Sequence, residues 1–487
     1  VCTPSRYGFL TGRYASRSTH EIFMEACPEG MQGYPVFNVG LEDNNYNVGA
    51  MMSKAGYRTG YVGKFHAGGI EGLRTPEDYA KYGMTYLPRD AEDSPETTAI
   101  FRSNERVARK MLTDRGFDWA KNIYLGNMDK PYHDHNLEWT IDAALEFIED
   151  SKNEPFYLHF CTTLVHGPDR SWSDSMREPL VSGEGMLEAP AQPEGMLSRE
   201  QILAELKKRG LDPTKGHAGY SWVDAGVGAV LSKLDKLGID DNTLVVFTAD
   251  HGSNRKGSLL DVDGICVPFL MRWPGGIKGG VETDALVQSL DIAATAFNLA
   301  GAKLPADYTL DGHSMAPLFQ GTEPKDWREY VYVELGTGRA IRTKEFKYTT
   351  LRYTEEMIEK IRKTPGGRLP IILSPLGRAG IGTRGAANPN FYVEDALFRI
   401  DADPKEMKNL AAEPEYGPKL EKMRALLTAE LESIGRPYGE LVPGGNATAP
   451  GQVDEQLDFA RRCRVNGKNV ITPDAAPSNK KRKHDND

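Results

Sequence analysis

The sequence predicts an α/β protein with a doubly wound, mostly parallel sheet flanked by helices, followed by a smaller α+β domain carrying an antiparallel sheet. In the first part, a helical pattern is followed three times by a strand that ends in polar residues and glycine. From about residue 327, short alternating strands with turns between them replace this pattern. Regular alternation of helix and strand is typical of parallel sheets, whose reactive groups gather outside the carboxyl ends of the strands.

The length of 487 residues predicts one large domain and one smaller domain. We expect the large domain over residues 1–325 and the smaller one over residues 326–436. Residues 437–487 end in the polar run SNKKRKHDND and are expected to form a largely disordered tail.

The elements of the large domain follow from periodicity. The three helix and strand pairs are expected at 47–55 with 57–62, at 137–148 with 155–160, and at 219–237 with 243–248. The strand at 243–248 is almost continuously apolar, which is typical of a strand buried on both faces. A further strand at 267–273 and a helix at 289–299 complete the domain.

The segments between these elements are expected to be irregular. Residues 14–40 have a loop-like composition, and residues 69–131 are polar and are predicted to be surface insertions. Residues 171–213 are rich in Pro, Gly and Met, with one short helix at 200–209, and are expected to line a cleft. The smaller domain is predicted to contain strands at 330–335, 340–343, 346–352 and 396–400 and a helix at 419–431.

The composition limits the possible partners. The 59 basic and 69 acidic side chains give a formal net charge of −10, which argues against broad nucleic-acid binding. An anionic substrate would therefore need a local cluster of Lys, Arg and His. No apolar run is long enough to span a bilayer. The five cysteines are scattered and form neither a disulfide framework nor a zinc pattern.

Candidate site residues lie where the three predicted strands end and in the first seventeen residues. Each has an ordinary structural interpretation when it is taken alone: a buried small side chain, a solvated charge, a hydrogen-bonded histidine or a capped turn. Their convergence at one edge of the sheet favours a functional site instead. The candidates are Cys2 and Arg6 in VCTPSRYGFLTGRYASR, Lys64 and His66 in GKFHAG, His166 in HGP, and Asp250 and His251 in DHG.

These motifs resemble those of the type I sulfatases, in the family's order, from residue 1 to about residue 414. The signature is CTPSR followed by LTGR, and GKFHAG is similar to the family's Gly-Lys-Trp-His motif with phenylalanine in place of tryptophan. RAIRTKEFKY (339–348) and LFRIDADPKEMKNLA (397–411) resemble segments of the family's C-terminal domain. Lys256 resembles a family lysine in the loop after DHG, although Arg255 beside it competes for this role.

The resemblance implies an alkaline-phosphatase-like fold and a sulfuric ester hydrolase. In that family a maturation enzyme oxidises the cysteine, here Cys2, to formylglycine, the nucleophile. Lys64 and Lys256 would bind sulfate oxygens, His166 would bind sulfate and assist the leaving alcohol, and His66 would contact the aldehyde hydrate. Arg6 would offset charge beside the aldehyde. The metal, calcium with magnesium as the alternative, would be bound by Cys2, Asp250 and His251, where many relatives have Asn in place of His251.

In the resembling family a strand that precedes the signature ends in paired aspartates that bind the metal. The sequence begins at Val1, so we expect the chain to be a fragment of a longer protein. As given, it should bind metal weakly and be inactive, whereas its parent should be active. Any signal peptide would lie in the same upstream part, and family resemblance favours a periplasmic or secreted location.

Three alternatives remain open at this point. A phosphonate or phosphate monoester hydrolase of the same superfamily would use a similar charge cluster. A non-catalytic protein that binds sulfated glycans would leave Cys2 unmodified, and a cysteine hydrolase would pair Cys2 with a histidine. The sulfate ester itself is also open among polysaccharides, glycosaminoglycan fragments and small aryl or choline esters; the segment 171–213 favours a carbohydrate.

Overall fold

The computed structural model describes residues 1–70, 75–88, 90–127, 131–132, 134–166, 172, 174–252, 255–352, 388, 390 and 393–445. The chain forms two compact units. The first comprises Val1–Ala26, Phe37–Ser253 and Val267–Glu329. The second comprises Cys27–Val36, Asn254–Cys266 and Tyr330–Asp487. The second unit therefore takes two short segments from the first part of the sequence.

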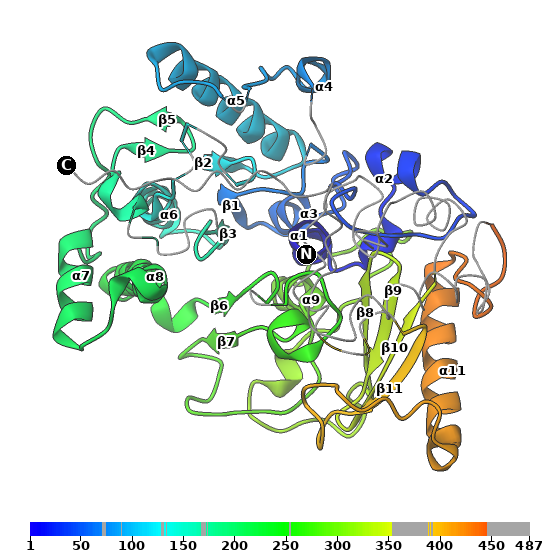
Figure 1. Cartoon of the computed structure of the whole chain (residues 1–487). Coiled ribbons are helices and arrows are strands. Elements are labelled where there is room, and N and C mark those ends of the chain that lie inside the picture. The colour runs from blue at the N-terminus through cyan, green and yellow to red at the C-terminus, as the bar shows by residue number, and fades with distance from the viewer. Residues whose placement is uncertain are drawn as a thin grey trace, which may run out of the picture. The chain divides into compact units, whose positions relative to one another are not determined.

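The first unit contains a three-stranded parallel sheet with the order β2-β1-β3 (Figure 1). The strands are β1 (Arg58–Lys64), β2 (Trp119–Tyr124) and β3 (Phe156–Cys161). A short hairpin is formed by β4 (Val181–Ser182) and β5 (Gly185–Met186). An antiparallel pair is formed by β6 (Val245–Thr248) and β7 (Phe269–Arg272).

Most helices of this unit begin where the sequence offers a capping side chain. Asn47 accepts a hydrogen bond from the Ala50 amide, and Asn136 accepts one from the Trp139 amide. The helices are α1 (Cys2–Thr11), α2 (Glu21–Ala26), α3 (Val48–Lys54), α4 (Pro76–Lys81), α5 (Pro95–Asp114), α6 (Leu137–Ser151), α7 (Arg199–Lys208), α8 (His217–Leu237) and α9 (Leu290–Ala300).

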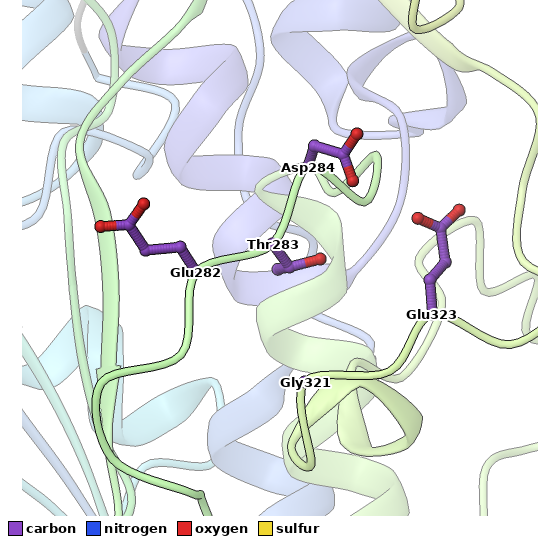
Figure 2. Close-up of a pocket in the computed structure, with 5 residues that line it drawn as sticks. All are labelled: Glu282, Thr283, Asp284, Gly321 and Glu323. Carbon is purple, nitrogen blue, oxygen red and sulfur yellow. The ribbon is translucent and has the colours of Figure 1, made fainter.

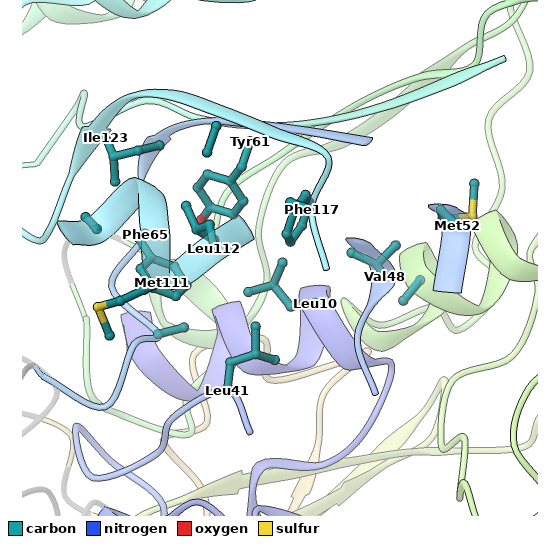
Figure 3. Close-up of a cluster of buried hydrophobic side chains, with 14 of the residues drawn as sticks. Leu10, Leu41, Val48, Met52, Tyr61, Phe65, Met111, Leu112, Phe117 and Ile123 are labelled. Carbon is teal, nitrogen blue, oxygen red and sulfur yellow. The ribbon is translucent and has the colours of Figure 1, made fainter. Parts of the chain in front are cut away.

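The two faces of the parallel sheet are covered by different helices. On one face, Tyr61 and Phe65 pack in a core with side chains of α1, α3, α5 and α9 (Figure 3). On the other face, Phe147 of α6 packs closely on Gly60, where a side chain on β1 would collide with its ring. A second core joins α6 to α7 and α8. Helices on both faces of a parallel sheet confirm the predicted fold class.

The prediction that residues 69–131 are irregular insertions is wrong. This segment contains α4, the 20-residue helix α5 and the sheet strand β2. The segment is polar overall, but α5 buries one apolar face through Ala108 and Leu112, and Ser94 caps its start. In the segment 14–40, which was expected to be a loop, the structure contains the short helix α2.

The prediction that the strand at 243–248, which is β6 in the structure, is buried on both faces is wrong. It pairs with β7 in an antiparallel arrangement, and Phe247 lies opposite Leu270. Phe247 is 39% exposed and Leu270 is 59% exposed. A continuous apolar run is consistent with a strand buried on both faces, but among the described strands β6 pairs with β7 alone. Among the described residues, no helix is long and apolar enough to cross a membrane.

The second unit contains the predicted antiparallel sheet. It has four strands, in the order β11-β10-β9-β8. Tyr438, in the segment expected to be a tail, is buried and donates to the carbonyls of Thr337 and Thr350. Residues 446–487 lie outside the described residues. The elements are β8 (Val331–Leu335), β9 (Gly338–Arg342), β10 (Phe346–Leu351), β11 (Asp395–Arg399) and α11 (Gly417–Ile434).

A buried ion network connects β9 and β10 to the segment 254–266 within this unit. Lys347 is fully buried, and its Nζ lies 2.7 Å from Asp261 Oδ1 and 3.1 Å from Glu406 Oε1. Lys347 Nζ also donates to the Leu259 carbonyl, and Arg342 Nε lies 2.9 Å from Asp261 Oδ2. The network holds the segment that carries Lys256 to the antiparallel sheet.

Candidate active site

Cys2 occupies the first turn of α1 and is 1% exposed. Its Sγ lies 3.1 Å from Nε2 of His251. Burial acts to raise the pKa of the Cys2 thiol, whereas the charge of Lys64 acts to lower it. The neighbouring imidazoles of His166, His251 and His66 lower the pKa further, to well below its usual value. The surroundings of Cys2 thus stabilise negative charge at this position.

Lys64 is the last residue of β1 and reaches the same place. A register shift between Val62 and Gly63 interrupts the pairing of β1 with β2 just before it. The Lys64 side chain is 2% exposed, and its Nζ donates to Oδ1 of Asn127 at 2.7 Å. A buried cation at the carboxyl end of a parallel strand is well placed to bind an anion.

Gly63 allows the backbone to leave the regular strand geometry just before Lys64. Its φ is +84°, and a Cβ at this position would overlap the backbone carbonyl of Cys161 on β3. We expect Gly63→Ala to lower the free energy of unfolding by about 3 kcal/mol or more, because the left-handed backbone and the clash both oppose alanine. Urea denaturation measures this.

The matched control for this prediction is Gly56→Ala. Gly56 has a φ of +88°, but nothing lies within 4 Å of the position that its Cβ would take. Only the backbone cost, about 1–2 kcal/mol, should appear there. Equal effects of the two substitutions would contradict the steric role of Gly63.

Arg6 joins three elements at the site. Its Nη1 donates to the Lys64 carbonyl at 2.8 Å, and its Nη2 lies 3.2 Å from Oδ2 of Asp250, which follows β6. Burial acts to lower the pKa of Arg6, but the neighbouring Asp250 carboxylate outweighs it and the net shift is upward. The pKa of Asp250 is lowered in turn, although burial opposes this. Arg6 and Asp250 are therefore both charged in the folded protein.

His66 stands in the turn after β1 with a φ of +43°. Burial and the charge of Lys64 lower its pKa to about 4. The imidazole is therefore neutral near neutral pH and can accept a proton. The Cys2 side chain acts to raise this pKa, which indicates that the imidazole lies near Cys2.

Asn127 was not predicted from the sequence. It lies beyond the end of β2, where its Oδ1 accepts from Lys64 and its Nδ2 lies 3.5 Å from Nε2 of His166. His166 follows β3, and its amide donates to the Thr163 carbonyl; the next residues of its motif, 167 and 168, lie outside the described residues. Lys64 was identified because it is a polar residue at the end of a predicted strand. The same criterion would have identified Asn127, but strand β2 was not predicted.

Cys2, Asp250 and His251 form a group that could hold a metal ion. One ligand atom from each lies within 4.8 Å of the other two. His251 Nδ1 lies 2.8 Å from the Gly252 carbonyl. In the tautomer that donates from Nδ1 to this carbonyl, Nε2 would offer its lone pair to a cation. An ionised carboxylate and an imidazole nitrogen suit a divalent cation. Calcium prefers six to eight oxygens, so water and substrate oxygens would have to complete its coordination.

Seven of the predicted site residues thus belong to the first unit and gather around the ends of β1, β3 and β6 and the start of α1. Lys256 belongs to the second unit. It lies in a turn in which the Ser258 amide donates to the Arg255 carbonyl. Its assignment remains a prediction.

A separate pocket of about 460 Å³ in the first unit is acidic. Figure 2 shows the carboxylates of Glu282, Asp284 and Glu323 around it, with Thr283 and Gly321. An anionic substrate would be repelled there. The cationic group around Lys64 is the better candidate for binding an anion.

Comparisons with known proteins agree with this geometry. A family model described as Sulfatase matches residues 1–302, and one described as N-sulphoglucosamine sulphohydrolase, C-terminal, matches residues 250–361. An arylsulfatase of Hemicentrotus pulcherrimus is 25% identical over 373 residues, which are 71% of this chain and 58% of that protein. Arylsulfatase A of Homo sapiens is 27% identical over 472 residues, which are 89% of this chain and 79% of that protein.

The fold is also similar to that of solved sulfatases. One such structure, a complex with its substrate D-glucosamine-2-N,6-O-disulfate, has a TM-score of 0.52 and 20% identity and covers 89% of this chain and 88% of that one. The likeness shows an alkaline-phosphatase-like fold. The chain spans less than two thirds of the length of several curated relatives that it matches.

Proposed function

Because the chain belongs to the sulfatase family, whose model matches residues 1–302, we propose that it is a sulfuric ester hydrolase that uses formylglycine made from Cys2. The observation that carries the proposal is the buried Cys2 among one lysine and three imidazoles. Residues that stabilise negative charge at Cys2 would equally stabilise an anionic sulfate that reacts there. A formylglycine-generating enzyme is the maturation partner that this chemistry requires.

The hydrated aldehyde of formylglycine would supply one hydroxyl that attacks sulfur and displaces the substrate alcohol, and a second whose deprotonation returns the aldehyde and releases sulfate; addition of water to the aldehyde then restores the nucleophile. Lys64 binds a sulfate oxygen and offsets the charge that develops in the transition state. His166 binds sulfate and helps to protonate the leaving alcohol. His66, which is neutral because its pKa is about 4, accepts the proton from the second hydroxyl. Arg6 keeps Asp250 ionised, and Lys256 is a second candidate cation for the sulfate oxygens.

A divalent cation, calcium or magnesium, is proposed to be held by Asp250, by Nε2 of His251 and by the oxidised side chain of residue 2. Its contribution would be to neutralise charge on the sulfate oxygens. The closeness of these three ligand groups supports the assignment. The imidazole of His251 is an unusual ligand for calcium, so metal analysis of the purified protein is needed to identify the ion.

The substrate is proposed to be a sulfated carbohydrate. The relatives include an endo-4-O-sulfatase of Bacteroides thetaiotaomicron, 27% identical over 66% of this chain and 61% of that protein. A structural neighbour was solved with a sulfated glucosamine. Such substrates fit a protein that acts outside the cytoplasm, in the periplasm or after secretion.

The test is sulfate release by the full natural protein, coexpressed with a formylglycine-generating enzyme, across sulfated sugars and aryl sulfates. We expect release that is lost in Cys2→Ala, lost after metal chelation, and restored by calcium. Mass spectrometry of the peptide that contains Cys2 should show the aldehyde. Phosphate release without sulfate release would favour the phosphonate or phosphate hydrolase. An unmodified Cys2 together with binding of sulfated glycans would favour the non-catalytic alternative.

A further inference from the structure

The carbonyl oxygen of Lys64 accepts two hydrogen bonds from side chains. Arg6 Nη1 donates at 2.8 Å, and Tyr61 Oη donates at 2.9 Å. Two donors on one carbonyl fix the plane of the peptide bond that leaves Lys64. The orientation of the side chain of Lys64 depends on this backbone, because the chain leaves the regular strand at Gly63.

The hydroxyl of Tyr61 is held firmly in this position. Tyr61 is fully buried, and its ring meets Phe65 and Phe117 edge to face, with ring centroids 5.7 Å and 5.4 Å apart. On its other side the ring stacks on His159 at 5.0 Å. A Tyr ring packed on three sides has little rotational freedom, so its hydroxyl is a fixed donor.

Tyr61 and Arg6 are not equivalent donors. The guanidinium of Arg6 also faces the Asp250 carboxylate, at 3.2 Å. An ionised carboxylate attracts the guanidinium more strongly than a carbonyl does. Tyr61 is neutral and sits on the same strand as Lys64, three residues earlier, so its bond does not depend on Asp250.

We infer that Tyr61 is a positioning residue for Lys64. Its hydroxyl holds the Lys64 backbone so that Nζ reaches Asn127 and the place where the anion binds. This inference rests on the proposed function, in which Lys64 offsets charge on the reacting sulfate. A small displacement of such a cation lowers the rate more than it lowers affinity.

Tyr61→Phe in the full natural protein tests this, because it removes the hydroxyl and keeps the packed ring. We expect kcat for sulfate release to fall about tenfold, below the roughly hundredfold that a misplacement of about 1 Å can cause, with KM changing less than about twofold. In a crystal structure of the variant, Lys64 Nζ should have moved away from Asn127 Oδ1.

Two control variants separate positioning from loss of stability. Tyr438→Phe removes another buried hydroxyl that donates to backbone carbonyls, in the second unit; it should lower the melting temperature without lowering kcat. Tyr61 Oη also contacts Cys161 Sγ at 3.7 Å, and Cys161→Ala should leave kcat near the wild-type value if the bond to Lys64 is the important one.

The outcomes are distinguishable. A kcat of Tyr61→Phe within about twofold of wild type, or an unmoved Lys64 in its crystal structure, overturns the inference. An equal loss of kcat in Tyr438→Phe would also overturn it, since that loss would reflect stability alone. Absence of sulfate release from the wild-type protein would instead contradict the proposed function, and the crystal structure would still decide the position of Lys64.

Discussion

Lys64→Met is expected to lower kcat for sulfate ester hydrolysis by about 10²–10³-fold, the range for loss of one preorganised group that stabilises developing charge. Lys64 is almost completely buried, and its cation lowers the pKa of both Cys2 and His66. Methionine keeps much of the length and volume of the side chain but removes the charge. Steady-state kinetics on the best substrate of the panel measures the effect.

The control is Lys110→Met, which removes an exposed lysine paired with Asp114 on α5. Its kcat should equal that of the wild type. Lys64→Arg is informative as well, because it keeps the charge but does not fit a site that holds a compact ammonium group. A kcat for Lys64→Met within about tenfold of wild type would show that Lys64 does not act on the transition state.

Lys347→Met is expected to lower the free energy of unfolding by about 3–5 kcal/mol, the cost of removing one partner from a buried ion group. Its Nζ contacts two carboxylates that are themselves buried. Burial acts to raise the pKa of both carboxyls, and the charge of Lys347 acts to lower it. The net shift is downward for Asp261 and upward for Glu406. Arg342 still contacts Asp261 in the variant, so Glu406 carries the larger penalty.

Urea denaturation over a range of pH tests this explanation. In the variant, the folded-state pKa of Glu406 should rise further above its unfolded value. The loss of stability caused by the ionised Glu406 carboxylate then appears above the pKa of this group in the unfolded chain, about 4. It disappears as the pH falls and the carboxylate is protonated. Lys152→Met, which removes an exposed lysine paired with Glu149, should cost no more than about 1 kcal/mol. A pH-independent loss in Lys347→Met would indicate a packing defect instead.

Much of the candidate site could be predicted because its residues follow a local rule. Lys64, His166 and Asp250 each lie at the end of a strand that periodicity identifies. For Lys64 and His166, the parallel strands β1 and β3 bring their carboxyl ends to one edge; Asp250 follows β6, which pairs with β7 outside that sheet. The roles of these residues remain proposals. What the local rule could not supply is the set of contacts between them, such as the bonds from Arg6 to the Lys64 carbonyl and to Asp250.

The sequence by itself determined the family, the α/β order of the first part, the antiparallel strands of the second and the residue types at the strand ends. These depend on periods and motifs within a few residues of one another. Only the tertiary structure showed β2 and the Asn127 that follows it, because a polar segment with one apolar helix face resembles a surface insertion until its partners are known. The antiparallel pairing of β6 with β7 was also visible only in the tertiary structure. So was the packing that makes the Tyr61 hydroxyl a fixed donor to the Lys64 carbonyl. Strand direction and side-chain contact depend on residues far apart in the chain, which no local pattern records.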